Sequence, residues 1–149
     1  MADEIKRYFT VAEAEGLIPR LEAIVGRVMD SHTAAARLRE ALQEAQRQVM
    51  LSGGARLDQE FWRSRKLGFE RAAARVQEGI GEILELGGVP KDLEMGLVDF
   101  LGLLGDREVN LCWRFGEKRI RFWHGLDEGY RARKPLPGDV REWREREET

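Results

Sequence analysis

Residues 106–135 contain most of the side chains in this sequence that are suited to chemistry. The stretch holds the only cysteine, one of the two histidines, two of the four tryptophans and six arginines. Such side chains bind metals or anions, or act as nucleophiles. Because none of them stands in the spacing of a specific catalytic or cofactor-binding motif, we predict no catalytic residue and favour a role without enzymatic activity.

His124, Asp127 and Glu128 lie close together where a predicted strand ends. An imidazole and two carboxylates could hold a divalent metal ion there, although no second histidine or cysteine is near in the sequence. The alternative is a structural histidine whose ring bonds to Asp127 and fixes the turn. We favour the structural role and predict no cofactor, with a divalent metal as the alternative.

Cys112 could serve as a nucleophile only if His124 lay on the same sheet face within hydrogen-bond distance. In the strand pairing that the sequence favours, the two side chains point to opposite faces. We therefore expect Cys112 to fill a half-buried sheet face as a small residue.

Four arginines are candidate anion-binding residues: Arg114, Arg119, Arg121 and Arg133. The first three share a predicted sheet face with Trp123 and Cys112, and residues 107–134 hold eight basic and four acidic side chains. Guanidinium groups around an exposed indole suit a phosphate or a carboxylate. The alternative is that these arginines pair with glutamates or are only solvated.

Alternating apolar and polar residues predict two strands joined by a two-residue turn at Gly116-Glu117. Three pairs of residues face each other in this register: Trp113–Ile120, Leu111–Phe122 and Val109–His124. Residues 97–101 form another strand. Residues 96–136 are thus predicted to form a three-stranded antiparallel sheet and an exit motif, with one face on the helices.

Two long amphipathic helices are predicted before this sheet. Residues 8–50 start with a capping box, in which Thr10 and Glu13 bond to each other's amides, and are interrupted at Pro19. Apolar residues spaced three and four apart then continue along this segment, and residues 58–86 show a similar stripe. The glycine-containing loop between them predicts an antiparallel, coiled-coil-like hairpin.

We therefore predict a single, mostly helical α+β domain over residues 1–149: the hairpin, the small sheet packed on it, and a short charged helix over residues 139–149. Each long helix has only one apolar seam, so side chains such as Trp62 and Phe69 would stay partly wet. We favour a homodimer through the hairpin as the remedy; the alternative is that the sheet covers the hairpin within one chain.

The amino-acid composition of the chain limits the classes of partner that it could bind. A formal net charge of −2 gives no signal for nucleic acid or membrane, and a single cysteine forms no internal disulfide. No apolar run approaches the roughly 20 residues that span a bilayer. We expect a soluble, cytoplasmic protein.

Several short segments resemble a group of bacterial hypothetical proteins, the domain-of-unknown-function family numbered 2203. These segments are residues 8–14, 17–21, 96–100, 111–114 and 116–117, the pair Trp123-His124, residues 127–130 and Arg133. The likeness covers roughly residues 5–136. It implies a fold and a motif but no reaction.

The sequence thus predicts an uncharacterised intracellular protein, a dimeric interaction or binding module with an anion-binding arginine face. The alternative is a metal- or anion-dependent enzyme with its site at the turn from Trp123-His124 to Tyr130. Cys112 and Trp113 are further motif residues near that site.

Overall fold

The helical part begins where the sequence places its caps. The computed structural model describes residues 6–53 and 58–137. Before α1 (Val11–Gly16), the Thr10 hydroxyl accepts a hydrogen bond from the Glu13 amide at 3.0 Å, and the Glu13 carboxylate accepts one from the Thr10 amide at 2.9 Å. This confirms the predicted capping box. Pro19 lies in the first turn of α2 (Ile18–Leu51), where its missing N–H leaves no helical hydrogen bond unmade.

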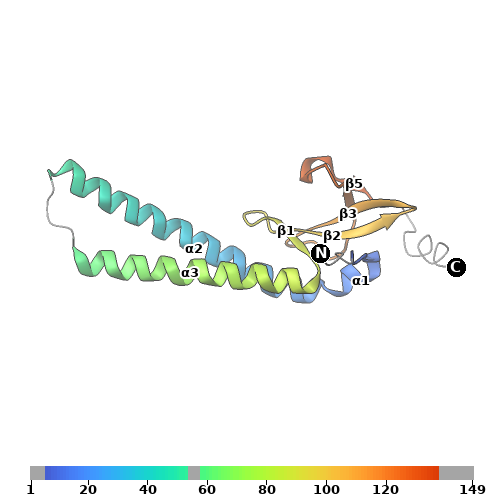
Figure 1. The fold of residues 1–149 in the computed structure, drawn as a ribbon, viewed down its shortest axis with the longest axis horizontal. Helices are drawn as coiled ribbons and strands as arrows, with labels where there is room; N and C mark the ends of the chain where they lie inside the picture. Colours follow the sequence, from blue (N-terminus) through green and yellow to red (C-terminus); the bar gives the residue numbers. More distant parts are fainter. Residues whose placement is uncertain (1–5, 54–57, 138–149) are drawn as a thin grey trace, which may run out of the picture.

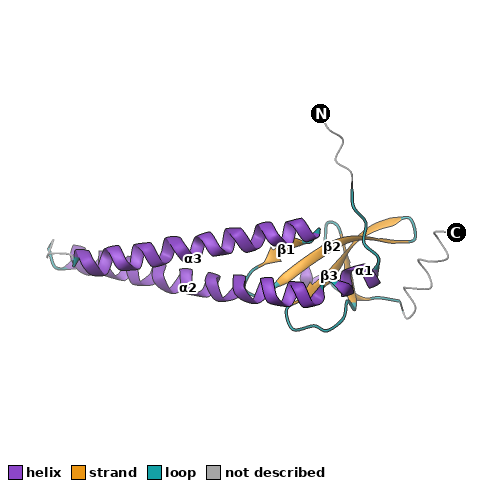
Figure 2. Cartoon of the chain, turned by 90° about the horizontal axis from the view of Figure 1, so that it is seen from below, coloured by secondary structure: helices purple, strands orange, loops and turns teal. Residues whose placement is uncertain are grey.

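The two long helices form the predicted antiparallel hairpin. The Asp58 side chain caps α3 (Gln59–Leu86), and Gly87 ends it in the left-handed conformation with φ of 96°. α2 and α3 lie side by side in both views and run in opposite directions (Figures 1 and 2). Coiled-coil packing along their seam stays a prediction.

Burial in the hairpin is confined to the half beside the sheet. The buried residues of α2 end at Ala35, and those of α3 begin at Ala72. In the remaining described part of the two helices, residues 36–51 and 59–71, no residue is buried. We call this part the distal hairpin.

The sheet has five strands and not the predicted three. The strands are β1 (Val89–Asp92), β2 (Leu97–Leu104), β3 (Arg107–Arg114), β4 (Phe122–Gly125) and β5 (Lys134–Pro135). They pair with their neighbours in this order, and every pair is antiparallel. β1 and β5 were missed because they are short edge strands that contain proline, a residue with no N–H to donate.

One face of the sheet packs on the helices and makes the core. Phe100 of β2 and Leu111 of β3 lie in one apolar cluster with Leu21 of α2 and Ile83 of α3. Phe9, which precedes α1, joins the same cluster, and its amide donates a hydrogen bond to the Leu101 carbonyl at 2.8 Å. The N-terminal segment is thereby tied to β2.

The predicted register between β3 and β4 is wrong by one residue. Four pairs face each other in the structure: Val109–Gly125, Asn110–His124, Leu111–Trp123 and Cys112–Phe122. Residues 115–121 form a seven-residue connection instead of a two-residue turn, and Ile120 is buried in the core. Because side chains alternate between faces, a slip of one residue moves every β4 side chain to the other face.

The predicted C-terminal helix, residues 139–149, lies outside the described residues. No helix in the described ranges is both long and apolar enough to cross a membrane.

Candidate metal centre

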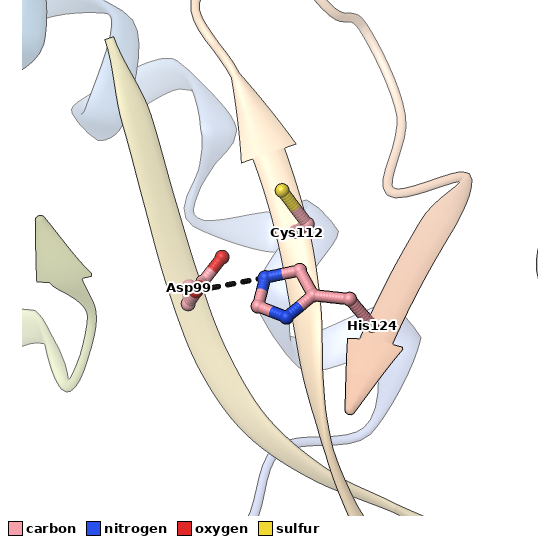
Figure 3. Close-up of side chains that lie close together, drawn as sticks. All are labelled: Asp99, Cys112 and His124. Atoms are coloured by element: carbon pink, nitrogen blue, oxygen red, sulfur yellow. Dashed lines mark ion pairs between the residues drawn. The ribbon is translucent and has the colours of Figure 1, made fainter. Parts of the chain in front are cut away.

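Three neighbouring strands place one chemical group each on the sheet face that turns away from the helices. Asp99 of β2 is directly opposite Cys112 of β3, and Asn110, two residues before Cys112, is opposite His124 of β4. Residues opposite or two apart share a face. Asp99, Cys112 and His124 therefore converge on one point of the sheet (Figure 3).

The three side chains are close together and buried. His124 Nε2 lies 3.0 Å from Asp99 Oδ2, and the three potential ligand atoms all lie within 4.8 Å of one another. Relative exposure is 2% for Asp99, 1% for Cys112 and 3% for His124. Buried polar groups ordinarily have hydrogen-bond partners, so the bonding of each group is informative.

The bonding around His124 places a proton on one ring nitrogen and leaves the other nitrogen facing Asp99. Nδ1 lies 2.9 Å from the Gly125 carbonyl oxygen, which can only accept a hydrogen bond. In the neutral ring the proton is therefore on Nδ1, and Nε2 presents a lone pair to Asp99. Neither carboxylate oxygen of Asp99 has a well-aligned hydrogen bond to a described residue, although His124 and the Cys112 thiol are close enough to act as donors that oppose the rise in its pKa. With a neutral ring, two electron-rich groups thus face each other at 3.0 Å, whereas a protonated ring would form an ion pair with Asp99.

Burial dominates the electrostatics of the other two groups. It raises the pKa of Asp99 above its usual value, and the charge of His124 opposes this rise. Burial, with the adjacent Asp99 carboxylate, raises the pKa of the Cys112 thiol to about 12. A thiol with this pKa is protonated at neutral pH and is a poor nucleophile. The structure puts Cys112 and His124 on the same face after all, but both ring nitrogens face Gly125 and Asp99.

The cluster lies in a cleft of about 540 Å³. The floor contains Asp99, Cys112 and His124. The remaining walls are formed by β1, the turn after it, the first residue of β2 and the exit segment that follows β4: Lys91, Asp92, Met95, Leu97, Glu128, Gly129, Tyr130 and Arg131. The centre is therefore buried among protein atoms and is reached through this cleft.

The candidate arginines do not share one face. Arg114 donates a hydrogen bond to the Tyr130 hydroxyl at 2.9 Å, whereas Arg119 and Arg121 lie in the connection before β4. Their predicted placement on one strand face is therefore corrected. Arg133 is occupied by Glu117, with contacts of 3.2 and 2.8 Å, and its guanidinium also stacks on aromatic rings. Anion binding by these arginines stays a prediction.

Trp113 and Trp123 both lie on the sheet face that packs against the core. Trp113 is fully buried, and its Nε1 donates to the Glu117 carbonyl at 2.9 Å. Trp123 is opposite Leu111 and packs against the core, on the face away from Cys112. The guanidinium of Arg107 and the amine of Lys134 lie over its ring. Trp123 is thus not part of the face that carries the centre.

Asp127 and Glu128 do not join His124 as a ligand group in the structure. Asp127 is exposed. Glu128 Oε1 accepts hydrogen bonds from the Gly125 amide at 2.6 Å and from Lys134 Nζ at 2.8 Å, and these contacts hold the pKa of Glu128 below its usual value. The predicted ring contact between His124 and Asp127 is replaced by contacts to Asp99 and Gly125.

A comparison with known protein families identifies the family of this chain. The model of a family of uncharacterised conserved proteins, DUF2203, matches residues 7–136. The chain belongs to this family. Neither the search of curated proteins nor the search of solved structures found a match.

In this DUF2203 chain, Asp99 is the site residue that reasoning from the sequence missed. It is the one acidic residue in the apolar run of residues 97–101, and in a strand with both faces covered an acid needs a partner. That signal was present in the sequence. Its partner could not be identified because the register of β4 placed His124 on the wrong face.

Proposed function

We propose that this DUF2203 protein binds a divalent transition-metal ion of the zinc class through Asp99, Cys112 and His124. The observation that carries the proposal is the convergence of three buried potential ligands, the Asp99 carboxylate, Nε2 of His124 and the Cys112 sulfur, within 4.8 Å of one another. A cation between them would bond to all three, including the Asp99 oxygens, which have no well-aligned hydrogen bond within the described ranges. The proposal gives a chemical reason for three polar side chains on an otherwise covered sheet face.

The donor set selects the kind of metal. A thiolate with an imidazole suits zinc and its neighbours, whereas magnesium and calcium prefer oxygen ligands alone. Bond lengths of about 2.0–2.3 Å place the ligand atoms of a tetrahedral zinc site about 3.3–3.8 Å apart. The observed spacing, 3.0 Å for one pair and below 4.8 Å for all pairs, needs only small side-chain shifts. A bound zinc ion also deprotonates a coordinating thiol despite its raised pKa.

The competing explanation is a protonated His124 that forms a buried ion pair with Asp99. This pair would account for the 3.0 Å distance without any metal. It would leave Cys112 as a protonated thiol beside Asp99, with its sulfur accepting a weak hydrogen bond from Arg133 at 3.9 Å. The two explanations therefore differ in what Cys112 does and in whether metal copurifies.

The test is the metal content of the tag-free protein, measured by mass spectrometry after dialysis against zinc. We expect about one equivalent of metal per chain in the wild type. Asp99→Asn and Cys112→Ser should bind the metal at least about tenfold more weakly and therefore retain less of it. Asp127→Asn is the matched control, because it removes the same charge from an exposed position three residues from His124. It should keep its metal.

Loss of metal in Asp127→Asn but not in Asp99→Asn would return the site to the turn after β4. A wild type without metal after zinc dialysis would reject the proposal and leave the His124–Asp99 ion pair.

A second proposal concerns the distal hairpin, where we propose that two copies of the chain associate. The supporting observation is that this part has no buried residue although Trp62 and Phe69 lie in it. Met50 is 76% exposed and Leu51 74% exposed at its end. A second copy would remove this apolar surface from water. Light scattering that gives 17.1 kDa at micromolar concentration would contradict it.

A further inference from the structure

We propose that the metal at Asp99, Cys112 and His124 takes a small organic anion, with a phosphate or carboxylate group, as a further ligand from the cleft. This inference rests on the metal-binding function proposed above. It assigns the anion to Lys91 and Arg131 on the cleft wall, and not to the arginines that the sequence suggested.

The first step is the number of ligands. Three protein ligands complete neither a tetrahedral nor a larger coordination shell, and zinc sites with three protein ligands keep a position for water or substrate. Among the described residues, no fourth histidine, cysteine or carboxylate joins the group. The other side of the centre is the cleft, so an exchangeable ligand would enter from there.

The second step is the charge on the cleft wall. Lys91 of β1 and Arg131 of the short helix η1 (Tyr130–Ala132) are both exposed. Neither has an ion pair or a side-chain hydrogen bond with any other described residue. The wall carboxylates differ, since Glu128 is paired with Lys134 and Asp92 accepts hydrogen bonds from backbone amides. Lys91 acts on Asp99 only through its charge, and the two cations therefore favour a negatively charged ligand in the cleft.

The third step is size. A cleft of about 540 Å³ is several times larger than a bare phosphate needs and falls in the range of about 300–1,000 Å³ for small-molecule sites. Tyr130 contributes a hydroxyl that accepts from Arg114, so its own proton is available for a ligand oxygen. The walls therefore suit a molecule that carries more than its anionic group.

Cobalt provides a direct test because its spectrum reports both the binding of the metal by Cys112 and the entry of the anion. Co²⁺ substitutes for zinc, and a Cys112 thiolate bound to it gives a charge-transfer band, while its visible bands change when a ligand enters the open position. We would load the full chain with one equivalent of Co²⁺ and titrate inorganic phosphate and, separately, succinate. Saturable changes in the visible bands are expected. The anion that binds more tightly shows whether the site prefers a phosphate or a carboxylate group.

The decisive comparison is between two double variants. Lys91→Ala with Arg131→Ala should keep the thiolate band and bind the anion at least about tenfold more weakly. Arg119→Ala with Arg121→Ala is the control, since it removes two exposed cations outside the cleft wall and should match the wild type.

Each contrary result has a distinct meaning. A thiolate band without any effect of either anion overturns this inference and leaves metal binding intact. No thiolate band overturns both proposals. Weaker anion binding only in the Arg119/Arg121 variant would move the anion site to the connection before β4 and overturn the assignment to the cleft.

Discussion

If Asp99 is a metal ligand as proposed, its carboxylate should destabilise the fold when no metal is bound. It is 2% exposed, and burial raises its pKa because the ionised form is poorly solvated there. A buried polar group without a partner costs about 1–3 kcal/mol, and a charged one costs more. A bound cation reverses this effect, because the free energy of binding adds to the free energy of folding. The same side chain is thus unfavourable or favourable according to the metal.

Asp99→Asn is therefore expected to have opposite effects with and without metal. In a chelator, removing the charge should raise the free energy of unfolding by about 1 kcal/mol. With zinc at about 100 times its Kd, the wild type should gain about 2.7 kcal/mol and the variant little. Urea unfolding in both conditions measures the difference. A variant that is less stable than the wild type by the same amount in both would indicate a His124–Asp99 ion pair instead.

At the scale of single residues, the sequence indicated which side chains could do chemistry but not which of them are in contact. His124 and Cys112 were recognised, and the acidic residue in the strand before them was visible. Whether two β-strand side chains share a face depends on whether their register is odd or even. The seven-residue connection has no short turn motif to set it, so the pairing of His124 with Asp99 could be found only in three dimensions.

At the scale of the elements, the close contact between the two long helices depends on a glycine. Gly79 of α3 is buried against Val28 of α2, and a Cβ added at Gly79 would lie 2.1 Å from Val28 Cγ2. Small residues let helix backbones approach closely. Val25 and Ile83, one turn away on the same two helices, belong to the core cluster that includes residues of β2 and β3.

Gly79→Ala should therefore destabilise the protein by about 1–3 kcal/mol, because the methyl group overpacks the helix contact. Gly81→Ala is the control on the same helix, since nothing lies within 4 Å of its added Cβ. It should stabilise the protein by about 0.5–1 kcal/mol through helix propensity. Thermal unfolding of the two variants compares them. Equal shifts in the same direction would show that the contact with Val28 is not tight in solution.

The elements differ in how far local sequence determines them. The capping box of Thr10 and Glu13 and the glycine after α3 are complete signals within a few residues, and the helix bounds follow from them. β1 and β5 have no such signal. Each has a proline and few residues, and each exists because a longer neighbouring strand offers it hydrogen bonds.

At the scale of the whole molecule, the buried core and the candidate metal centre lie at the same end. The sheet, α1 and the nearer halves of α2 and α3 contain the core and the cleft, and the hairpin extends away from them (Figure 2). Most of the stability of a helix in a protein comes from packing of its apolar face, and no described residue of the distal hairpin is buried. The distal hairpin is therefore the part of the described chain whose stability would gain most from a partner.

If two copies associate through the distal hairpin, a charge placed there should separate them. Leu67 is 45% exposed in the distal part of α3, and Leu84 is 54% exposed on the same helix beside the sheet. We expect the wild type to have twice the 17.1 kDa mass of one chain in light scattering. Leu67→Lys should weaken self-association by at least about tenfold, because a buried interface disfavours an unpaired charge, and Leu84→Lys should not. A dimer that both variants leave intact would place the interface away from the distal hairpin, and one that only Leu84→Lys dissociates would place it beside the sheet.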